Sequence, residues 1–410
     1  MDILYHKLKD CCSKIGSGAT PKGGKSVYTD EGVSLIRSQN VYNLIFSYKG
    51  LAHITDEAAK KLSGVTIQEN DVLLNITGDS VARTCIVPND VLPARVNQHV
   101  AIIRPNKSLD PTFLNYYLAS PAMQGYLLNI ASTGASRNAI TKAAIEKLII
   151  PAPKIDEQHK IASLLSSYNN LIENNNKRIK ILEQMAENLY KEWFVRFRFP
   201  GHETTPIENG IPKSWNECRL GDCMLFNRGT SYSSEDIVDG DLALLSMNNI
   251  RPYGGYIADY SRSFSGKYKT EQIVHENDLI MSITDMTQDR RIIGYVGLVG
   301  PTEKKCVICT HLMKISSSVY HNYFLYGLFT FSGLSKSVSE QATGTNVLGL
   351  TAKILNKIKC VIPEIKLTNL YSQKVAPIFE EIHSIEKQNE NLIKQRDLLL
   401  PRLMSGKLAV

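Results

Sequence analysis

The first loop of the chain places glycines, a lysine and a serine at a spacing that resembles a phosphate-binding loop. It reads GSGATPKGGKS, from Gly16 to Ser26. A nucleotide-binding loop needs Gly, four residues and then Gly-Lys-Ser/Thr, followed by a helix whose N-terminus faces the phosphate. Counting back from Gly24 puts Ala19 where the first Gly is required, and the next residues, VSLIRSQNVYN, alternate as a strand and a turn do. We therefore expect no nucleotide site here.

Cysteine and histidine occur once at a spacing that suits a metal ion. Cys306 and Cys309 form a CxxC pair with His311 close by, inside a run of β-branched residues. A closed zinc site needs four ligands, usually as two close pairs. The sequence holds no second CxxC, although Cys218 and Cys223 lie in the same half of the chain. We expect structural, buried cysteines and no metal site.

Length and composition indicate a globular protein of more than one domain. The 410 residues include 47 Lys and Arg against 40 Asp and Glu, a net charge of +7, and a chain of this length forms two or three domains. The mild basic excess is compatible with a polyanionic partner. The opening MDILYHKLKD carries charges where a signal peptide needs an apolar core, and the apolar run YFLYGLFTF is too short to span a bilayer. We expect a cytoplasmic protein with no membrane segment and with reduced cysteines.

The sequence repeats itself in its second half. ENDVLLNITGD recurs as ENDLIMSITDM, LIRSQNV as LLSMNNI, and STGASRNAIT as ATGTNVLGLT. Similar strings in the same order predict two homologous domains in tandem. We place these domains at 1–153 and 201–363, followed by helical segments at 154–200 and 364–410. His99 and His311 occupy equivalent positions in the two copies, and because no nucleophile or metal ligand accompanies them we expect structural roles for both.

Each helical segment carries apolar residues at alternating steps of three and four, the pattern of a coiled-coil seam. The first seam includes Ile161, Leu165, Ile172, Asn175, Ile179 and Leu182; the second includes Ile382, Ile385, Asn389, Leu392 and Leu399. Each seam has one asparagine near its middle. If the second helix runs back antiparallel to the first, the two asparagines meet and each satisfies the other's amide. The alternative is that each asparagine faces solvent.

These elements predict an α+β protein built as a pseudo-twofold tandem repeat. Two mixed, strand-rich globular domains are separated by two long antiparallel helices that form a coiled-coil spacer. At about 1.5 Å per residue the seam from 161 to 189 spans roughly 42 Å. Duplex DNA rises about 3.4 Å per base pair, so the spacer would cover about a dozen base pairs.

The loops between the expected strands are rich in side chains that read DNA. Arg and Lys reach guanine edges, Asn and Gln reach adenine edges, and Ser and Thr bind phosphates. The candidates in the first domain are Lys22, Lys25, Arg37, Ser38, Gln39, Asn40, Arg83, Arg95, Asn97, Arg137 and Asn138. Those in the second domain are Asn248, Asn249, Arg251, Gln288, Arg290, Arg291, Thr345 and Asn346. For any single residue, the alternative is a solvated loop side chain without contact to DNA.

Over essentially its whole length the chain resembles the specificity subunit of a type I restriction-modification system. The resemblance rests on the duplicated domains, the paired seams, and the strings IIPAPKIDEQHKIASLL, LYKEWFVRFRFPG and RDLLLPRLMSGKL. It implies that each globular domain is a target recognition domain for one half of a bipartite, asymmetric DNA site. The second copy departs from the pattern at NRGTSYSSED, which has no Pro after Thr230, so we expect its start loop to differ from the first.

The resemblance also implies partners and cofactors. The helices would set the spacing between the half-sites and dock two modification subunits, which methylate adenine with S-adenosylmethionine. Restriction subunits would add cleavage driven by ATP with Mg²⁺, and no cofactor is expected on this chain. The sequence itself holds no Asn/Asp-Pro-Pro-aromatic motif and no glycine-rich methyl-donor loop. Since a base must be flipped into a pocket to be methylated, we expect that chemistry from a partner and a non-catalytic role for this chain.

Two other functions remain open from the residues alone. A stand-alone enzyme acting on nucleic acid would bind a methyl donor or a divalent metal. A scaffold protein would bind DNA without sequence preference. The aromatic run YKEWFVRFRF bears on the scaffold, because Trp193, Phe194 and Phe197 could form a partner-docking patch. They could equally seal the helix end onto its own domain.

Overall fold

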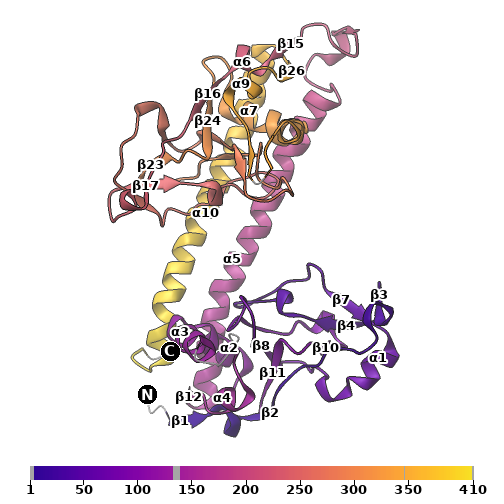
Figure 1. Cartoon of the computed structure of the whole chain (residues 1–410), viewed down its shortest axis with the longest axis vertical. Helices are drawn as coiled ribbons and strands as arrows, with labels where there is room; N and C mark the ends of the chain where they lie inside the picture. Colours follow the sequence, from indigo (N-terminus) through magenta and orange to yellow (C-terminus); the bar gives the residue numbers. More distant parts are fainter. Residues whose placement is uncertain (1–3, 133–138, 346, 409–410) are drawn as a thin grey trace. The chain divides into compact units, whose positions relative to one another are not determined.

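The computed structural model describes residues 4–132, 139–345 and 347–408, and the chain divides into two compact units. Unit 1 comprises Met1–Glu173 and Glu390–Val410, and unit 2 comprises Asn174–Asn389. Two long helices, α5 (Ile155–Tyr190) and α10 (Ile365–Met404), each contribute residues to both units (Figure 1). The helical segments expected from the sequence are therefore divided between the units, because their apolar residues pack into the globular cores.

Unit 1 is built on two four-stranded sheets and two short strand pairs. The antiparallel sheet has the order β2 (Cys12–Ser17), β11 (Val100–Pro105), β8 (Val72–Asn75), β9 (Thr84–Ile86). The second sheet has the order β10 (Ala94–Val96), β4 (Val33–Ile36), β7 (Ala52–Ile54), β3 (Tyr28–Thr29), with β10 and β4 parallel. The pairs are β1 (Leu4–Lys7) with β12 (Ile149–Ala152) and β5 (Val41–Tyr42) with β6 (Ile45–Phe46).

Four shorter helices complete the described part of unit 1, and their ends follow ordinary capping chemistry. They are α1 (Asp56–Lys61), α2 (Pro111–Ala119), α3 (Pro121–Ser132) and α4 (Lys142–Glu146). Asp110 caps α2 by accepting a hydrogen bond from the Phe113 backbone N–H at 2.7 Å, and Pro111 occupies the first helical position. Helices α2 and α3 lie beside α5, whereas α1 lies at the opposite end of unit 1 near β3 and β7 (Figure 1).

Unit 2 repeats the antiparallel sheet strand for strand and three strands of the second sheet; the fourth strand differs, since β3 pairs with β7 in unit 1 whereas β19 pairs with β23 in unit 2. The antiparallel sheet has the order β16 (Leu225–Arg228), β24 (Leu312–Ser316), β20 (Leu279–Ser282), β22 (Val296–Leu298). The second has the order β18 (Ser263–Phe264), β17 (Leu242–Leu245), β23 (Lys305–Ile308), β19 (Ile273–Val274), and β17 runs parallel to β23 as β4 does to β10. The repeat in the sequence is therefore a repeat of the fold.

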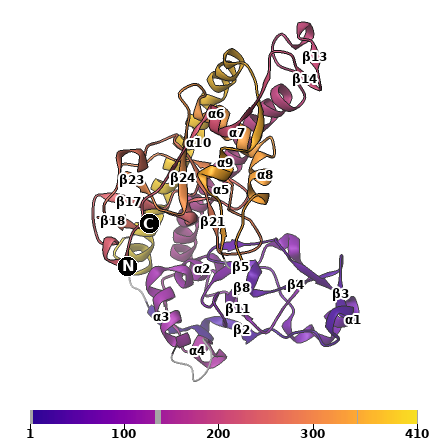
Figure 2. The ribbon, with the colours of Figure 1, turned by 45° about the horizontal axis from the view of Figure 1, so that its top comes forward.

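The remaining elements of unit 2 are strand pairs and short helices. The pairs are β15 (Asn216–Arg219) with β26 (Lys359–Ile362), β21 (Thr284–Asp285) with β25 (Leu348–Gly349), and β13 (Ile207–Glu208) with β14 (Ile211–Pro212). The helices are α6 (Leu220–Cys223), α7 (Asn322–Thr330), α8 (Leu334–Glu340) and α9 (Ala352–Leu355). Figure 2 shows β17, β18 and β23 on one side of unit 2 and α7 and α8 on the other.

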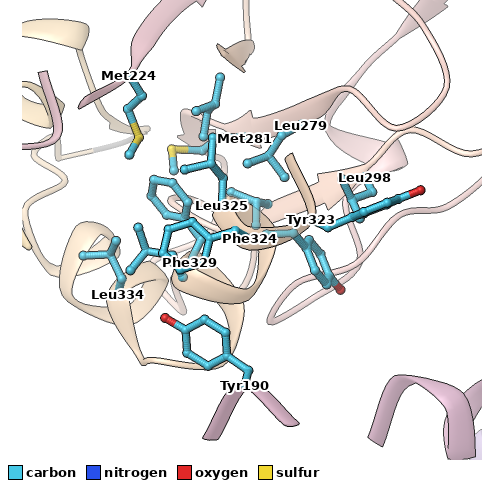
Figure 3. Packing of buried hydrophobic residues seen from close by; sticks show 14 of the residues in the cluster. Tyr190, Met224, Leu279, Met281, Leu298, Tyr323, Phe324, Leu325, Phe329 and Leu334 are labelled. Atoms are coloured by element: carbon cyan, nitrogen blue, oxygen red, sulfur yellow. The ribbon is translucent and has the colours of Figure 1, made fainter. Parts of the chain in front are cut away.

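Helix α7 lies at the centre of the unit 2 core. Its sequence NYFLYGLFT is apolar all round, which is typical of a buried helix, and Phe324 and Phe329 have no exposed surface. Leu279 and Met281 of β20 cover one side of α7 and Tyr190 of α5 the other (Figure 3). The long helix is thus part of the core that supports the sheet.

The two long helices run antiparallel and place their central asparagines together. Asn175 Nδ2 donates to Asn389 Oδ1 at 2.9 Å, and both side chains are buried. Residues later in α5 contact residues earlier in α10, as antiparallel helices require. Arg178 pairs with Glu381 at 2.7 Å, and the Tyr371 hydroxyl donates to the Ala186 carbonyl at 3.3 Å.

The other seam residues pack into the nearest core. In unit 1, Ile161 and Leu165 lie in the core with Leu400 and Leu403, whereas unit 2 buries Ile179, Ile382 and Ile385. Ile172, Leu182, Leu392 and Leu399 are half-buried.

Asn389→Ala is expected to lower the free energy of unfolding by about 1–3 kcal/mol, because it leaves the buried Asn175 amide without its partner. The measurement is the urea midpoint at constant slope. Asn174→Ala, at an exposed position of the partner helix α5 next to Asn175, is the control and should leave the midpoint unchanged. Equal midpoints for the two variants would contradict the prediction.

The described residues show neither a membrane span nor a metal site. No helix among them combines the length and apolar composition that crossing a bilayer would require. No group of three or more His, Cys, Asp or Glu side chains in this part of the chain is placed to hold a metal ion. Cys306 and Cys309 are fully buried in unit 2, and burial raises the pKa of the Cys306 thiol to about 11.

Candidate nucleic-acid interface

Loops from distant parts of the sequence join at one edge of the unit 1 sheets. The Gly18 backbone N–H donates to the Val100 carbonyl at 2.9 Å, and the Ala19 N–H donates to the Val96 carbonyl at 3.0 Å. The Asn97 N–H donates to the Ile36 carbonyl at 3.0 Å. These bonds tie the start loop and the turn between β10 and β11 to the end of β4.

The loop after β8 joins the same edge. The Ile76 N–H donates to the His99 carbonyl at 3.0 Å, and the Ile140 N–H donates to the Ile76 carbonyl at 2.8 Å. We call residues 18–26, 37–40, 76–83 and 95–99 the loop cluster of unit 1. Most of the first-domain candidates belong to it, although they are spread over some eighty positions of the sequence.

Unit 2 builds an equivalent cluster with the same bonds. The Gly229 N–H donates to the Leu312 carbonyl at 3.0 Å and the Thr230 N–H to the Ile308 carbonyl at 2.9 Å. The Cys309 N–H donates to the Leu245 carbonyl, and the Ile283 N–H donates to the His311 carbonyl at 3.0 Å. We call residues 228–234, 246–251, 283–291 and 308–311, with Thr345, the loop cluster of unit 2.

The two start loops are therefore equivalent, and the expectation that they differ is wrong. Thr230 replaces the alanine that precedes Thr20 in the first copy, and no Pro follows, yet the loop is held by the same two backbone bonds. What the two loops share is a glycine pressed against a carbonyl. A Cβ on Gly18 would lie 2.2 Å from the Val96 oxygen, and one on Gly229 would lie 2.1 Å from the Cys309 oxygen. The glycine, and not the proline, fixes the loop.

Two predicted base-reading asparagines are structural. Asn40 has no exposed surface, and Asn249 is 2% exposed. Asn40 Oδ1 accepts from the Arg37 N–H and its Nδ2 donates to the Ser47 carbonyl. Asn249 Oδ1 accepts from the Ser246 N–H and its Nδ2 donates to the Ile257 and Asp259 carbonyls. With both ends of the amide bonded inside the fold, neither side chain is free to read a base.

Three predicted arginines are largely engaged by backbone carbonyls. Arg95 Nε donates to the Ala59 carbonyl at 3.1 Å, and burial lowers the pKa of this guanidinium. Arg290 donates to the Ser339 and Ala342 carbonyls. Arg37 Nη2 donates to the Gly50 carbonyl at 2.7 Å, where Gln39 Nε2 also donates at 3.0 Å. In this structure the three arginines hold the loops that carry them through these hydrogen bonds.

Other candidates remain at the surface. Lys22, Lys25 and Asn248 are exposed, as are Gln288, Arg291 and Thr345. Gln288 Nε2 donates to the Thr345 carbonyl at 2.9 Å, which brings those two loops together. Arg83 lies with its guanidinium carbon 4.8 Å from the centre of the Tyr42 ring, and Arg251 pairs with Glu183 of α5 at 3.3 Å. Arg137, Asn138 and Asn346 lie outside the described residues.

Asn97 and Ser38 shape the cluster from within. Asn97 is 9% exposed, and its Oδ1 accepts from the His99 N–H at 3.1 Å. The Ser38 carbonyl accepts from Nδ2 of Asn75, a fully buried residue at the end of β8. Sequence reasoning missed Asn75; the signal for it was a polar residue closing the otherwise apolar string VLLN.

Aspartates before β8 and on both sides of β20 are bonded inside the fold, and those before the strands lie at the strand ends away from the loop clusters. Asp71 is fully buried and forms two 2.7 Å bonds with Arg104, and Asp278 pairs with Lys314 at 2.6 Å. In the loop after β20, burial alone would raise the pKa of Asp285. Hydrogen bonds from the Thr287 N–H and hydroxyl and from two further backbone N–H groups outweigh it, so the pKa is lowered.

The aromatic run after α5 is largely part of the unit 2 core. Trp193 is 6% exposed and Phe194 is 7% exposed, and both belong to the core of unit 2. They lie in the π-helical turn Lys191–Val195, and Phe194 packs against Trp215 at 5.9 Å between ring centres. Phe197 is half-buried against the same Trp215 ring. These rings pack against their own domain because the turn directs them inward.

Comparison with known proteins gives a consistent result. A family model described as the type I restriction modification DNA specificity domain matches residues 4–184 and again 212–395. The type I restriction enzyme MjaIX specificity subunit of Methanocaldococcus jannaschii is 27% identical, covering 98% of this chain and 93% of that protein. The HindI specificity subunit of Haemophilus influenzae is 23% identical, covering 92% and 94%. The S subunit structure from M. genitalium has a TM-score of 0.58 at 16% identity, over 98% of this chain and 96% of that one.

Proposed function

Because the chain belongs to the family of type I restriction-modification DNA specificity proteins, we propose that each of its loop clusters reads one half of a bipartite DNA site. The chain is a non-catalytic recognition subunit. The observation that carries the proposal is the pair of equivalent clusters, each presenting exposed basic and amide side chains on a rigid sheet edge. Two different sets of loop residues on one scaffold suit two different half-sites.

The surface residues divide by chemistry into two groups. Lys22 and Lys25 are flexible point charges suited to phosphates, and Arg291 is half-exposed beside Asp289 at 3.4 Å. Gln39, Asn248 and Gln288 present amides that can pair with an adenine edge. We propose these six residues, with Arg83 and Arg251, as the DNA-contacting set. Both arginines keep partly exposed guanidinium groups that DNA can recruit from their present partners.

The proposed partners are those that membership of the family implies. Two modification subunits would bind it and methylate adenine with S-adenosylmethionine. Restriction subunits would complete the assembly with ATP and Mg²⁺. Their docking surface is not the Trp193 and Phe194 side chains, which are buried; exposed positions of α5 and α10 remain for it.

The function is tested by mapping methylated bases in cells that express this chain together with its modification subunit, beside cells that express that subunit alone. N6-methyladenine at one bipartite motif, present only with this chain, is the expected result, and the same data give the motif and its gap. If methylation is absent, or is the same with and without this chain, the scaffold function is favoured instead. A scaffold would bind DNA without sequence preference.

A paired deletion tests whether the helices set the gap. The register that pairs Asn175 with Asn389 places residues 166–172 of α5 opposite 392–398 of α10. Deleting both stretches keeps the seam and should shorten the gap in the methylated motif by about three base pairs, from the rises per residue and per base pair. Deleting 166–172 alone breaks the pairing and should abolish specific methylation. An unchanged gap after the paired deletion would contradict the proposal that the helices set the gap.

A further inference from the structure

Each loop cluster contains a threonine–histidine pair in the same place. In unit 1, Thr77 Oγ1 lies 2.6 Å from His99 Nδ1, and in unit 2 Thr284 Oγ1 lies 3.1 Å from His311 Nδ1. All four residues are half-buried, so each pair reaches the surface. The sequence analysis assigned both histidines structural roles, and nothing in the proposed set of DNA contacts uses them.

The threonine–histidine pairs lie where the loops of each cluster meet. The backbone carbonyls of His99 and His311 accept the bonds that join the loop after β8 or β20 to the turn before β11 or β24. Thr77 also forms a β-bridge with Ala139, and Thr284 pairs with Gly349 of β25. The rings are therefore fixed by backbone on both sides, and DNA bound to either cluster would pass close to them.

The threonine fixes which ring nitrogen is left for another contact. Nδ1 faces the threonine hydroxyl in both pairs, so Nε2 is the nitrogen that points away from it. A hydroxyl can donate to Nδ1 or accept from it, and when it donates, the neutral ring carries its hydrogen on Nε2. In unit 2 the Thr284 hydroxyl also lies 3.0 Å from Met247 Sδ, but a thioether is the weaker acceptor. The ring with its hydrogen on Nε2 is the form that can donate to a ligand.

The Nε2 atoms are open to a ligand. In unit 1 the side-chain nitrogen of Gln98, an exposed residue, lies 3.2 Å from His99 Nε2. An amide nitrogen only donates, so while Gln98 is in place Nε2 accepts and the ring hydrogen lies on Nδ1. In unit 2, within the part of the chain that the structure describes, Nε2 of His311 has no hydrogen-bond partner. A phosphate that displaces Gln98 in unit 1 would bind the other tautomer, in which the Thr77 hydroxyl donates to Nδ1 and Nε2 carries the hydrogen.

The surroundings of the two pairs differ, and this indicates what the pairs contact. Beside His99 the cluster carries Arg37, Ser38 and Gln39, whereas beside His311 it carries Ser246, Met247 and Asn248. Under the proposed function the two clusters read different base sequences. A feature that both clusters keep while their other residues differ suits the part of DNA that is the same at every site, the phosphate backbone.

We propose that His99 and His311 each donate their Nε2–H to a DNA phosphate oxygen, and that Thr77 and Thr284 are the positioning residues that hold the rings in this orientation. This inference rests on the proposed function, since it deepens the description of the same surface. It adds one uncharged phosphate contact to each half-site.

The test uses substitutions that separate the two ring nitrogens. A glutamine amide reaches the place of Nε2, whereas the shorter asparagine amide reaches only that of Nδ1. His99→Ala and His99→Asn should lose the phosphate contact, and His99→Gln should keep it. His311 is changed in the same way, and His53→Ala, a half-buried residue of β7 outside the cluster, is the control. Thermal unfolding of every variant checks that it folds.

Affinity is measured for the full chain with its modification subunit on three duplexes: the methylated motif and the motif with either half-site scrambled. We expect His99→Ala and His99→Asn to weaken binding to all three by the same factor, about threefold to tenfold for one neutral hydrogen bond. His99→Gln should restore it. The slope of affinity against salt should stay unchanged, because a neutral donor releases no counterion.

Other outcomes overturn the inference. A loss confined to one duplex would indicate a base contact, and rescue by His99→Asn instead of His99→Gln would indicate a purely structural bond to Thr77. No loss in any variant would exclude contact with DNA. If the wild-type chain shows no preference for the motif, the proposed function fails, but a uniform loss of the remaining affinity in His99→Ala would still support the phosphate contact. The two failures are therefore distinguishable.

Discussion

Gly18→Ala is expected to abolish recognition of one half-site while leaving the other intact. The new methyl group would lie 2.2 Å from the Val96 oxygen and 2.3 Å from the Asn97 oxygen, both backbone atoms. Neither can move without breaking the bond from the Ala19 N–H to Val96 or the bond from the Asn97 N–H to Ile36. The start loop, which carries Lys22 and Lys25, must therefore leave the cluster, at a cost of about 1–3 kcal/mol or more for overpacking.

The matched control is Gly16→Ala in the preceding strand, where an added Cβ meets nothing within 4 Å. Mapping methylated bases reads the result directly: Gly18→Ala should relax the sequence requirement in one half of the motif, and Gly16→Ala should not. Gly229→Ala should relax the other half, because its methyl group would lie 2.1 Å from the Cys309 oxygen. Gly18→Ala and Gly229→Ala affecting the same half-site would contradict the assignment of one cluster to each half.

Asp71→Ala is expected to be the most destabilising single substitution in unit 1. Asp71 is fully buried, receives two 2.7 Å bonds from Arg104 and accepts a third from the Gln68 N–H at 2.7 Å. Removing one partner of a buried ion pair leaves an uncompensated charge and costs about 3–5 kcal/mol. We expect a loss of that size in the free energy of unfolding, measured by urea titration monitored on unit 1.

The control for Asp71 is an ion pair of the same length at the surface. Lys61 and Glu57 also lie 2.7 Å apart, but their side chains are 73% and 79% exposed. Glu57→Ala should leave the free energy of unfolding nearly unchanged, because water already solvates both charges. Similar losses in the free energy of unfolding for Asp71→Ala and Glu57→Ala would show that burial does not increase the contribution of the Asp71–Arg104 pair to stability. Asp278→Ala tests the same arrangement in unit 2, where Lys314 is the partner.

The candidate interface was only partly predictable from the sequence. Composition and loop position drew attention to Lys22, Lys25 and Asn248, which the structure places at the surface. The same reasoning gave Asn40 and Asn249 to DNA, whereas both amides are saturated by backbone groups up to ten residues away. An asparagine after a strand suits a turn as well as a base edge. Whether such an asparagine closes a turn or faces DNA depends on how the loop folds around its side chain.

For His99 and His311 the sequence shows less than the structure does. Their equivalent positions were visible in the repeat, but their partners, Thr77 and Thr284, lie more than twenty residues away. Hydrogen bonds across such separations depend on strand order and register, which a single sequence does not state. The sequence left self-packing and partner docking of the aromatic run open for a related reason, because the direction of the Trp193 and Phe194 rings depends on the turn that ends α5.

The sequence by itself determined the duplication and the two long helices, each with one asparagine near the middle of its seam. These features are periodic or repeated, so each is expressed in the order of neighbouring residues and needs no knowledge of distant contacts. The tertiary structure alone decided which loop residues reach the surface, why Gly18 and Gly229 must be glycine, and where the threonine–histidine pairs stand. Those properties depend on the distances between segments far apart in the chain, which folding sets only when the strands pair and the cores close.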